Sequence, residues 1–144
     1  MTMQYSETEG ETIDAIALEL SSSGSWAEAC ADETETVEWV QTHISHVFLV
    51  GNRVFKLHKA VAMPFLDFRR REARNADCVR EIVLNRRLAP DVYLGVAALL
   101  WDGESVRLGG ISESIEDPER EHVVVMRRLP PGGDALAALT KDRL

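Results

Sequence analysis

Lys56 and Glu81 are the two residues of this 144-residue chain whose types and spacing fit a reaction chemistry. Lys56 lies in the apolar segment Val54-Phe-Lys-Leu57, and Glu81 follows 25 positions later in a segment with helical periodicity. In a partly dry cleft, a lysine amine can bind nucleotide phosphate oxygens as a point charge, and a neighbouring carboxylate holds that amine in place. Two ordinary interpretations stay open. For Lys56, the aliphatic stem would be buried and the amine solvated. For Glu81, the carboxylate would be exposed and paired with nearby arginines.

The segment around Lys56 has the pattern of a β-hairpin. Residues 46–50 and 53–58 are rich in β-branched and aromatic side chains. Gly51-Asn52 between them accepts the positive φ that a tight turn requires. Because side chains alternate along a strand, Lys56 is expected on the face opposite its two apolar neighbours.

The remaining apolar patterns predict an α+β fold. We expect an antiparallel five- to six-stranded sheet, one main packed helix and an N-terminal helix. The expected elements are, in chain order, a helix at 12–20 after a frayed segment 1–11, strands at 37–42, 46–50 and 53–58, a helix at 69–88, strands at 92–101, 105–108 and 121–127, and a short helix at 135–139.

The helix at 69–88 is expected to bury an apolar stripe against the sheet. Asp67 is suited to cap its N-terminus. The connection before the helix is expected to be anchored to the core by Phe65, Leu66 and Phe68. The predicted buried stripe comprises Ala76, Val79, Ile82, Val83 and Arg86, widened by Leu84 and Leu88.

Charge is distributed unevenly along the chain. The formal net charge is −8, but residues 1–40 contain ten acids and no lysine or arginine, so the remainder has a small excess of positive charge. This balance argues against nucleic-acid binding. A local basic cluster is expected to form a solvated helix face or to pair with the acidic arm 1–36, rather than to form a phosphate-binding patch. The cluster comprises Arg69, Arg70, Arg71, Arg74, Arg80, Arg86 and Arg87.

The lengths of the apolar runs and the spacing of the cysteines indicate in which cellular compartment the protein resides. No apolar run approaches eighteen residues, and the N-terminus lacks a basic segment followed by an apolar one. The sequence therefore predicts neither a membrane span nor a secretory signal. Cys30 and Cys78 match no metal or redox spacing, which favours a reduced, cytoplasmic protein.

Four segments provide the basis for a family resemblance. They are Thr42-His-Ile-Ser45, Val54-Phe-Lys-Leu57, Phe65-Leu-Asp-Phe68 and Glu81-Ile-Val-Leu-Asn-Arg-Arg-Leu-Ala-Pro-Asp-Val-Tyr-Leu94. Together they resemble a bacterial group of aminoglycoside-phosphotransferase-like proteins, which have a protein-kinase-like fold. The resemblance implies a kinase-like small lobe at 37–130. It also implies, at 131–144, a hinge with the start of a truncated large lobe. The acidic composition sets residues 1–36 apart as an N-terminal arm with a short helix.

The resemblance implies that the chain binds ATP or GTP with Mg²⁺. Lys56 then corresponds to the nucleotide-phosphate lysine and Glu81 to its helix partner. Ser45 or backbone amides of its turn would contact phosphate, whereas His43 is better suited to capping that turn. The segment 126–129 would offer its backbone to adenine as the hinge. The implied nucleotide-binding residues are Lys56, Glu81, Ser45, His43, Met126, Arg127 and Arg128.

The sequence also departs from the family. The catalytic aspartate, the metal-binding asparagine and a later magnesium aspartate belong to the large lobe, and no His-x-Asp segment occurs here. We therefore expect no catalytic residue, no Mg²⁺ ligand and no phosphate transfer by this chain alone. The expected partners are nucleotide, a missing or separately encoded large lobe, and a second copy joined through exposed lobe surface.

Two alternatives stay open. One is a non-catalytic binding or regulatory module that keeps the small-lobe fold. The other is a small α/β domain in which Lys56 and Glu81 are surface residues whose side chains point apart.

Overall fold

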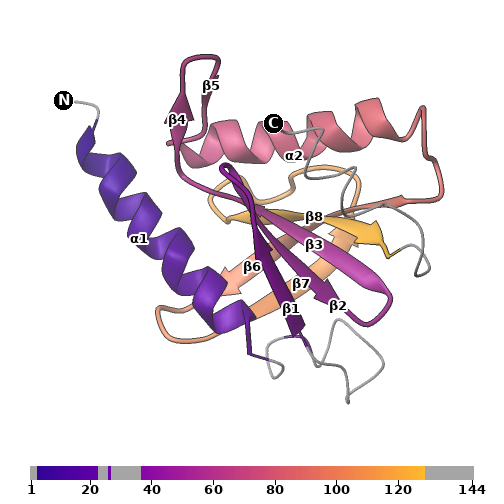
Figure 1. Cartoon of the computed structure of the whole chain (residues 1–144), viewed down its shortest axis with the longest axis horizontal. Helices are drawn as coiled ribbons and strands as arrows, with labels where there is room; N and C mark the ends of the chain where they lie inside the picture. The colour runs from indigo at the N-terminus through magenta and orange to yellow at the C-terminus, as the bar shows by residue number, and fades with distance from the viewer. Residues whose placement is uncertain (1–2, 23–25, 27–36, 129–144) are drawn as a thin grey trace.

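The structure, a computed structural model, describes residues 3–22, 26 and 37–128 (Figure 1). The helices and strands are α1 (Met3–Leu20), β1 (Val37–Gln41), β2 (Ser45–Val50), β3 (Arg53–His58), β4 (Ala62–Met63), β5 (Leu66–Asp67), α2 (Arg71–Asn85), β6 (Tyr93–Trp101), β7 (Val106–Ser112) and β8 (His122–Arg127). Cys30, the predicted helix at 135–139 and the predicted hinge beyond Arg128 lie outside the described residues.

Six strands form one sheet in the order β1-β2-β3-β8-β6-β7, and every neighbouring pair is antiparallel. β4 and β5 form a separate two-stranded hairpin. The last described strand, β8, lies inside the sheet because it pairs with β3 on one side and β6 on the other. The predicted α+β class, with its antiparallel sheet and main helix, is confirmed.

Each face of the sheet has its own hydrophobic core. One core joins α1 to the sheet and contains Trp26, whose ring centroid lies 4.3 Å from that of Phe55. The other core joins α2 to the sheet through Cys78 and Ile82. Alternation along β3 sends Phe55 into the first core and Val54 into the second. The two helices are therefore held to the same sheet through opposite sets of strand side chains.

The hairpin around Lys56 forms where it is predicted. β2 and β3 pair in register, with Val47 opposite Lys56, and Gly51 in the turn has a φ of 58°. A second special glycine, Gly95, has a φ of 153° where the pairing of β6 with β8 shifts. A Cβ atom there would lie 2.5 Å from the carbonyl oxygen of Ser112, so the close approach of β6 and β7 requires glycine.

The N-terminal helix is longer than predicted. α1 begins at Met3 rather than at residue 12, so the expected frayed segment is wrong for the described residues from Met3 onward. Its predicted apolar stripe is confirmed, since Ile13, Ile16, Ala17 and Leu20 are all buried. Once these turns are packed, extending the helix adds one hydrogen bond per residue at low cost. No helix of the described residues is both long and apolar enough to cross a membrane.

The connection between β3 and α2 differs from the prediction at two points. Phe65 is 78% exposed at the tip of the β4–β5 hairpin and anchors nothing, whereas Phe68 is buried. Asp67 does not cap α2. Its carboxylate instead accepts hydrogen bonds from the backbone and side chain of Arg69. Arg70 occupies the N-cap position without a side-chain cap, so the helix begins at Arg71.

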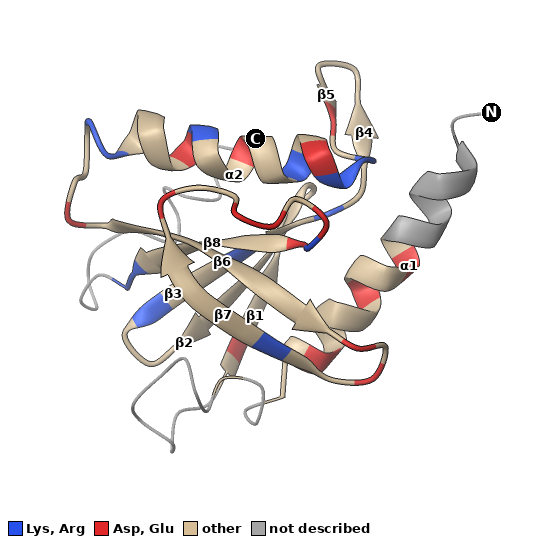
Figure 2. Ribbon diagram, turned by 180° about the vertical axis from the view of Figure 1, so that it is seen from behind, with Lys and Arg blue, Asp and Glu red and all other residues tan. Residues whose placement is uncertain are grey.

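The buried face of α2 is also different from the predicted stripe. Val83, Leu84 and Leu88, the last just beyond the helix, are 54%, 52% and 87% exposed, and Ala76 is exposed as well. The buried α2 residues are Arg74, Asn75, Asp77, Cys78, Glu81 and Ile82. Figure 2 shows acidic and basic residues following one another along α2. Apolar periodicity fails here because most inward side chains are polar groups with partners on the sheet side.

Candidate functional site

Lys56 and Glu81 meet at the interface of β3 and α2. The Lys56 Nζ lies 3.0 Å from each carboxylate oxygen of Glu81 and donates to both. Strand alternation turns Lys56 toward α2, and Glu81 lies beside Ile82 on the inward helix face. Lys56 is 2% exposed and Glu81 is 4% exposed. The predicted contact is confirmed, and the interpretation of both as surface residues is wrong.

Because the Lys56–Glu81 pair is buried, its net contribution to the stability of the fold is small. Removing two charges from water costs several kcal/mol per ion, and their attraction offsets that cost only while both partners are present. Apolar residues of similar volume would serve stability about as well. The pair does something that apolar residues cannot, because it fixes an ammonium group at one defined position between β3 and α2.

A second polar group lies next to this pair. His58 Nε2 is 2.6 Å from Asp77 Oδ2, and His58 Nδ1 is 3.7 Å from Cys78 Sγ. The order of thiol, imidazole and carboxylate is that of an activated cysteine nucleophile. However, burial raises the pKa of the Cys78 thiol well above its ordinary value, and Glu81 raises it further. The thiol therefore stays protonated, and the group is unsuited to nucleophilic catalysis.

The same interior contains a set of residues whose types suit a metal. Ligand atoms of His58, Asp77 and Glu81 lie within 4.8 Å of one another, and an imidazole with two carboxylates suits a divalent transition ion. Each ligand has a competing partner, since Lys56 bonds Glu81 and His58 bonds Asp77. We therefore assign these residues to a buried hydrogen-bonded network.

Arg74 and Glu121 form another buried ion pair, near the start of α2. Arg74 Nε and Nη2 donate to the two Glu121 oxygens at 2.8 and 2.9 Å, and Nη1 donates to the Phe68 carbonyl at 2.8 Å. Arg74 is 1% exposed. The predicted solvated arginine face is therefore wrong at this position, and Arg86 also turns back, donating to two backbone carbonyls of β6.

Ser45 and His43, at the turn before β2, lie in different environments: Ser45 is buried and His43 is exposed. Ser45 pairs with His58 across the hairpin, and its buried Oγ has no hydrogen-bond partner among the described residues. His43 is exposed. Thr42 caps the turn instead, since its Oγ1 accepts from two backbone amides of the turn at 3.0 and 3.3 Å. The capping role expected for His43 is wrong, and those two amides already have an acceptor.

The predicted hinge residues lie at the end of β8. Met126 is buried in the core on the α2 side, and the Arg127 side chain is exposed. The backbone amide of Arg127 donates to the Val92 carbonyl at 2.7 Å, and that of Arg128 donates to the Asn52 carbonyl at 2.8 Å. Arg128 also pairs with an acid on β1. These two amides are thus engaged within the sheet region.

Sequence reasoning missed three participants in the interior network: His58, Asp77 and Glu121. A signal for His58 was present, because strand alternation places it on the same face as Lys56. Asp77 lies one helical turn before Glu81, which places both on one helix face. No local pattern identifies Glu121, because it precedes an apolar strand and finds Arg74 only in the folded chain.

The chain is similar to mycobacterial proteins. "Uncharacterized protein Rv2004c" of Mycobacterium tuberculosis strain H37Rv is 44% identical over 88 residues, which cover 61% of this chain and 15% of that protein. MT2060 of Mycobacterium tuberculosis strain CDC 1551 and Mb2027c of Mycobacterium bovis match to the same extent. The chain thus spans about 15% of the length of these curated relatives. No family model and no solved structure matches it.

Proposed function

We propose that this chain binds a nucleotide as the small lobe of an aminoglycoside-phosphotransferase-like kinase, in the bacterial cytoplasm. The observation that supports this most is the Lys56–Glu81 pair, with the ammonium 3.0 Å from both carboxylate oxygens. In kinase-like sites, a strand lysine held by a helix glutamate binds nucleotide phosphates. The ligand is ATP or GTP, and Lys56 supplies its positive charge.

Other features of the described residues support this proposal. Ser45 lies on the same strand face as Lys56, and its unpartnered hydroxyl could donate to a phosphate oxygen. Met126 lies on the α2 side of the sheet, where an adenine ring would need an apolar surface. Because Lys56 is 2% exposed, nucleotide binding requires the surrounding side chains to open.

Phosphate transfer would need groups beyond this small lobe. Mg²⁺ bound with the nucleotide would offset the charge of the phosphates. The resemblance places the Mg²⁺ ligands in the large lobe, and their motif does not occur in this sequence. Within the proposal, Lys56 binds and orients the nucleotide and Glu81 positions Lys56. A large lobe, on the same or another polypeptide, would supply the base. The exposed Val83, Leu84 and Leu88 offer apolar surface for that lobe or for a second copy.

A calorimetric titration with ATP and with adenosine tests the nucleotide proposal. We expect ATP to bind the wild-type chain about tenfold or more tightly than adenosine, because a charge-assisted hydrogen bond contributes about 1.5–3 kcal/mol. Lys56→Gln should remove this preference while leaving adenosine binding unchanged, which also reports that the variant is folded. Lys59→Gln, a neighbouring half-buried lysine, is the matched control and should keep the preference. Equal binding of ATP and adenosine by the wild-type chain would contradict the proposal.

A second candidate function is a non-catalytic binding or regulatory module with this fold. The deep burial of Lys56 and the engaged amides of Arg127 and Arg128 favour it. In this case the Lys56–Glu81 pair serves only to position α2 on the sheet. The titration distinguishes the two functions, because a module of this kind shows no dependence on the phosphates of the added nucleotide.

A further inference from the structure

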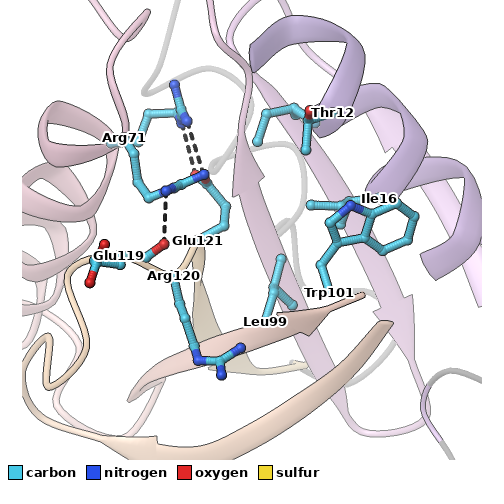
Figure 3. A pocket seen from close by; sticks show the side chains of 10 residues that line it. Thr12, Ile16, Arg71, Leu99, Trp101, Glu119, Arg120 and Glu121 are labelled. Carbon is cyan, nitrogen blue, oxygen red and sulfur yellow. Dashed lines mark hydrogen bonds and ion pairs between the residues drawn. The ribbon is translucent and has the colours of Figure 1, made fainter. Parts of the chain in front are cut away.

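A cavity of about 140 Å³ lies between α1, β6 and the start of α2, apart from the Lys56–Glu81 pair. Figure 3 shows Ile16 and Trp101 on one side of it and Arg71 with Glu121 on the other. The cavity thus has one apolar wall and one charged wall. We propose that it binds a small monocarboxylate with a single apolar ring or a branched aliphatic group.

The apolar wall suits a body about the size of a ring. Ile13 and Ile16 come from α1, and Leu99 and Trp101 come from β6. The first three are each 2% exposed and form the floor, so the half-buried Trp101 supplies most of the apolar surface that a ligand can reach. A dry apolar cavity of about 150 Å³ can hold benzene. The volume therefore matches one ring and leaves no room for a nucleotide, which separates this site from the proposed nucleotide site.

Arg71 provides the contact for the carboxylate. Its Nε lies 3.4 Å from Glu121 Oε1, and its Nη1 donates to the Glu119 carbonyl at 2.8 Å. Glu121 is more closely bound to Arg74, at 2.8 and 2.9 Å, so one carboxylate serves two guanidinium groups. A guanidinium has five donors in a planar fork, and those contacts use two of the donors of Arg71. Its side chain is 40% exposed and open to an incoming carboxylate.

The charge of the lining selects a monoanion. Arg71 and Arg74 share the single carboxylate of Glu121, which leaves one positive charge among these three groups, while Arg120 at the rim is paired with Asp117 at 3.0 Å. In Figure 3 the Glu119 carboxylate points away from Trp101, so it does not repel a ligand placed on the apolar wall. A carboxylate supplies one negative charge and the bidentate geometry that a guanidinium prefers. A phosphate dianion would exceed this charge and lacks the apolar body.

Benzoate, benzamide and acetate test the two walls separately, with the whole chain observed by NMR. The sequence has three tryptophans, and the indole N–H signal of Trp101 is assigned by its absence from Trp101→Phe. We expect benzoate to shift that signal with a Kd on the order of 1 mM. Benzamide, which keeps the ring, and acetate, which keeps the charge, should each bind about tenfold or more weakly.

Arg71→Gln and Arg70→Gln form a matched pair of variants at the start of α2. Arg70 is exposed and its side chain does not line the cavity. Arg71→Gln should weaken benzoate binding about tenfold and abolish the preference over benzamide, whereas Arg70→Gln should change binding by less than about twofold. Equal loss in the two variants, equal affinity for benzoate and benzamide, or no shift of Trp101 up to about 10 mM benzoate would overturn the proposal.

Discussion

Replacing Lys56 with methionine is expected to lower the free energy of unfolding by about 3–5 kcal/mol. The variant keeps a side chain of similar length but leaves the Glu81 carboxylate, 4% exposed, without the ammonium that now lies 3.0 Å from both of its oxygens. A buried carboxylate that has lost its counter-ion is the main source of the loss. Urea-induced unfolding measures the change.

The double variant Lys56→Met/Glu81→Leu shows whether the charge itself is responsible. It removes both charges together, so we expect most of the lost stability to return, to within about 1 kcal/mol of wild type. Lys59→Met, at the half-buried residue that follows β3, should change stability by less than about 0.5 kcal/mol. A double variant as unstable as the single one would show that the pair is not the origin of the effect.

Replacing Arg74 with methionine is expected to destabilise the fold by a similar amount, about 3–5 kcal/mol. Arg74 is 1% exposed and donates hydrogen bonds to both Glu121 oxygens and to the Phe68 carbonyl. Its loss leaves the buried Glu121 carboxylate with the longer contact to Arg71, at 3.4 Å, and leaves the Phe68 carbonyl without this donor. Unfolding in urea, followed by circular dichroism, measures the change.

Arg71→Met is the matched control, because Arg71 contacts the same carboxylate from a partly exposed position, at 3.4 Å. We expect it to change stability by about 0–1 kcal/mol. Arg74→Lys should recover only a small part of the loss, since a lysine cannot donate two parallel hydrogen bonds to one carboxylate. Equal effects of Arg71→Met and Arg74→Met would contradict this description of the network.

The elements of the fold follow from local patterns where the apolar residues face a core. The β2–β3 hairpin forms as predicted because Gly51 supplies the turn conformation and alternating side chains on both strands have a core to enter. α1 buries its predicted stripe for the same reason. β7 extends to Ser112, beyond its prediction, because its pairing with β6 resumes at Ile111 and Ser112 after a register shift at the two intervening glycines.

The face of α2 could not be predicted from apolar periodicity. Its inward residues Arg74, Asp77 and Glu81 are charged, and each meets an opposite or titratable group from a distant segment. Burial of such groups becomes favourable only through these long-range contacts, which no local window of sequence contains. The pairing of Lys56 with Glu81 was predictable because strand alternation and the resemblance both placed the two residues on facing elements.

Labelling with a lysine-reactive acyl phosphate of ATP tests the nucleotide site most directly. The probe transfers its acyl group to a lysine amine next to the bound phosphates, and the chain has three lysines, Lys56, Lys59 and Lys141. We expect peptide mass spectrometry to find the acyl group on Lys56, and we expect excess ATP, but not adenosine, to suppress this labelling. Labelling of Lys59 or Lys141 with Lys56 unmodified, or labelling of Lys56 that ATP does not suppress, would contradict the account.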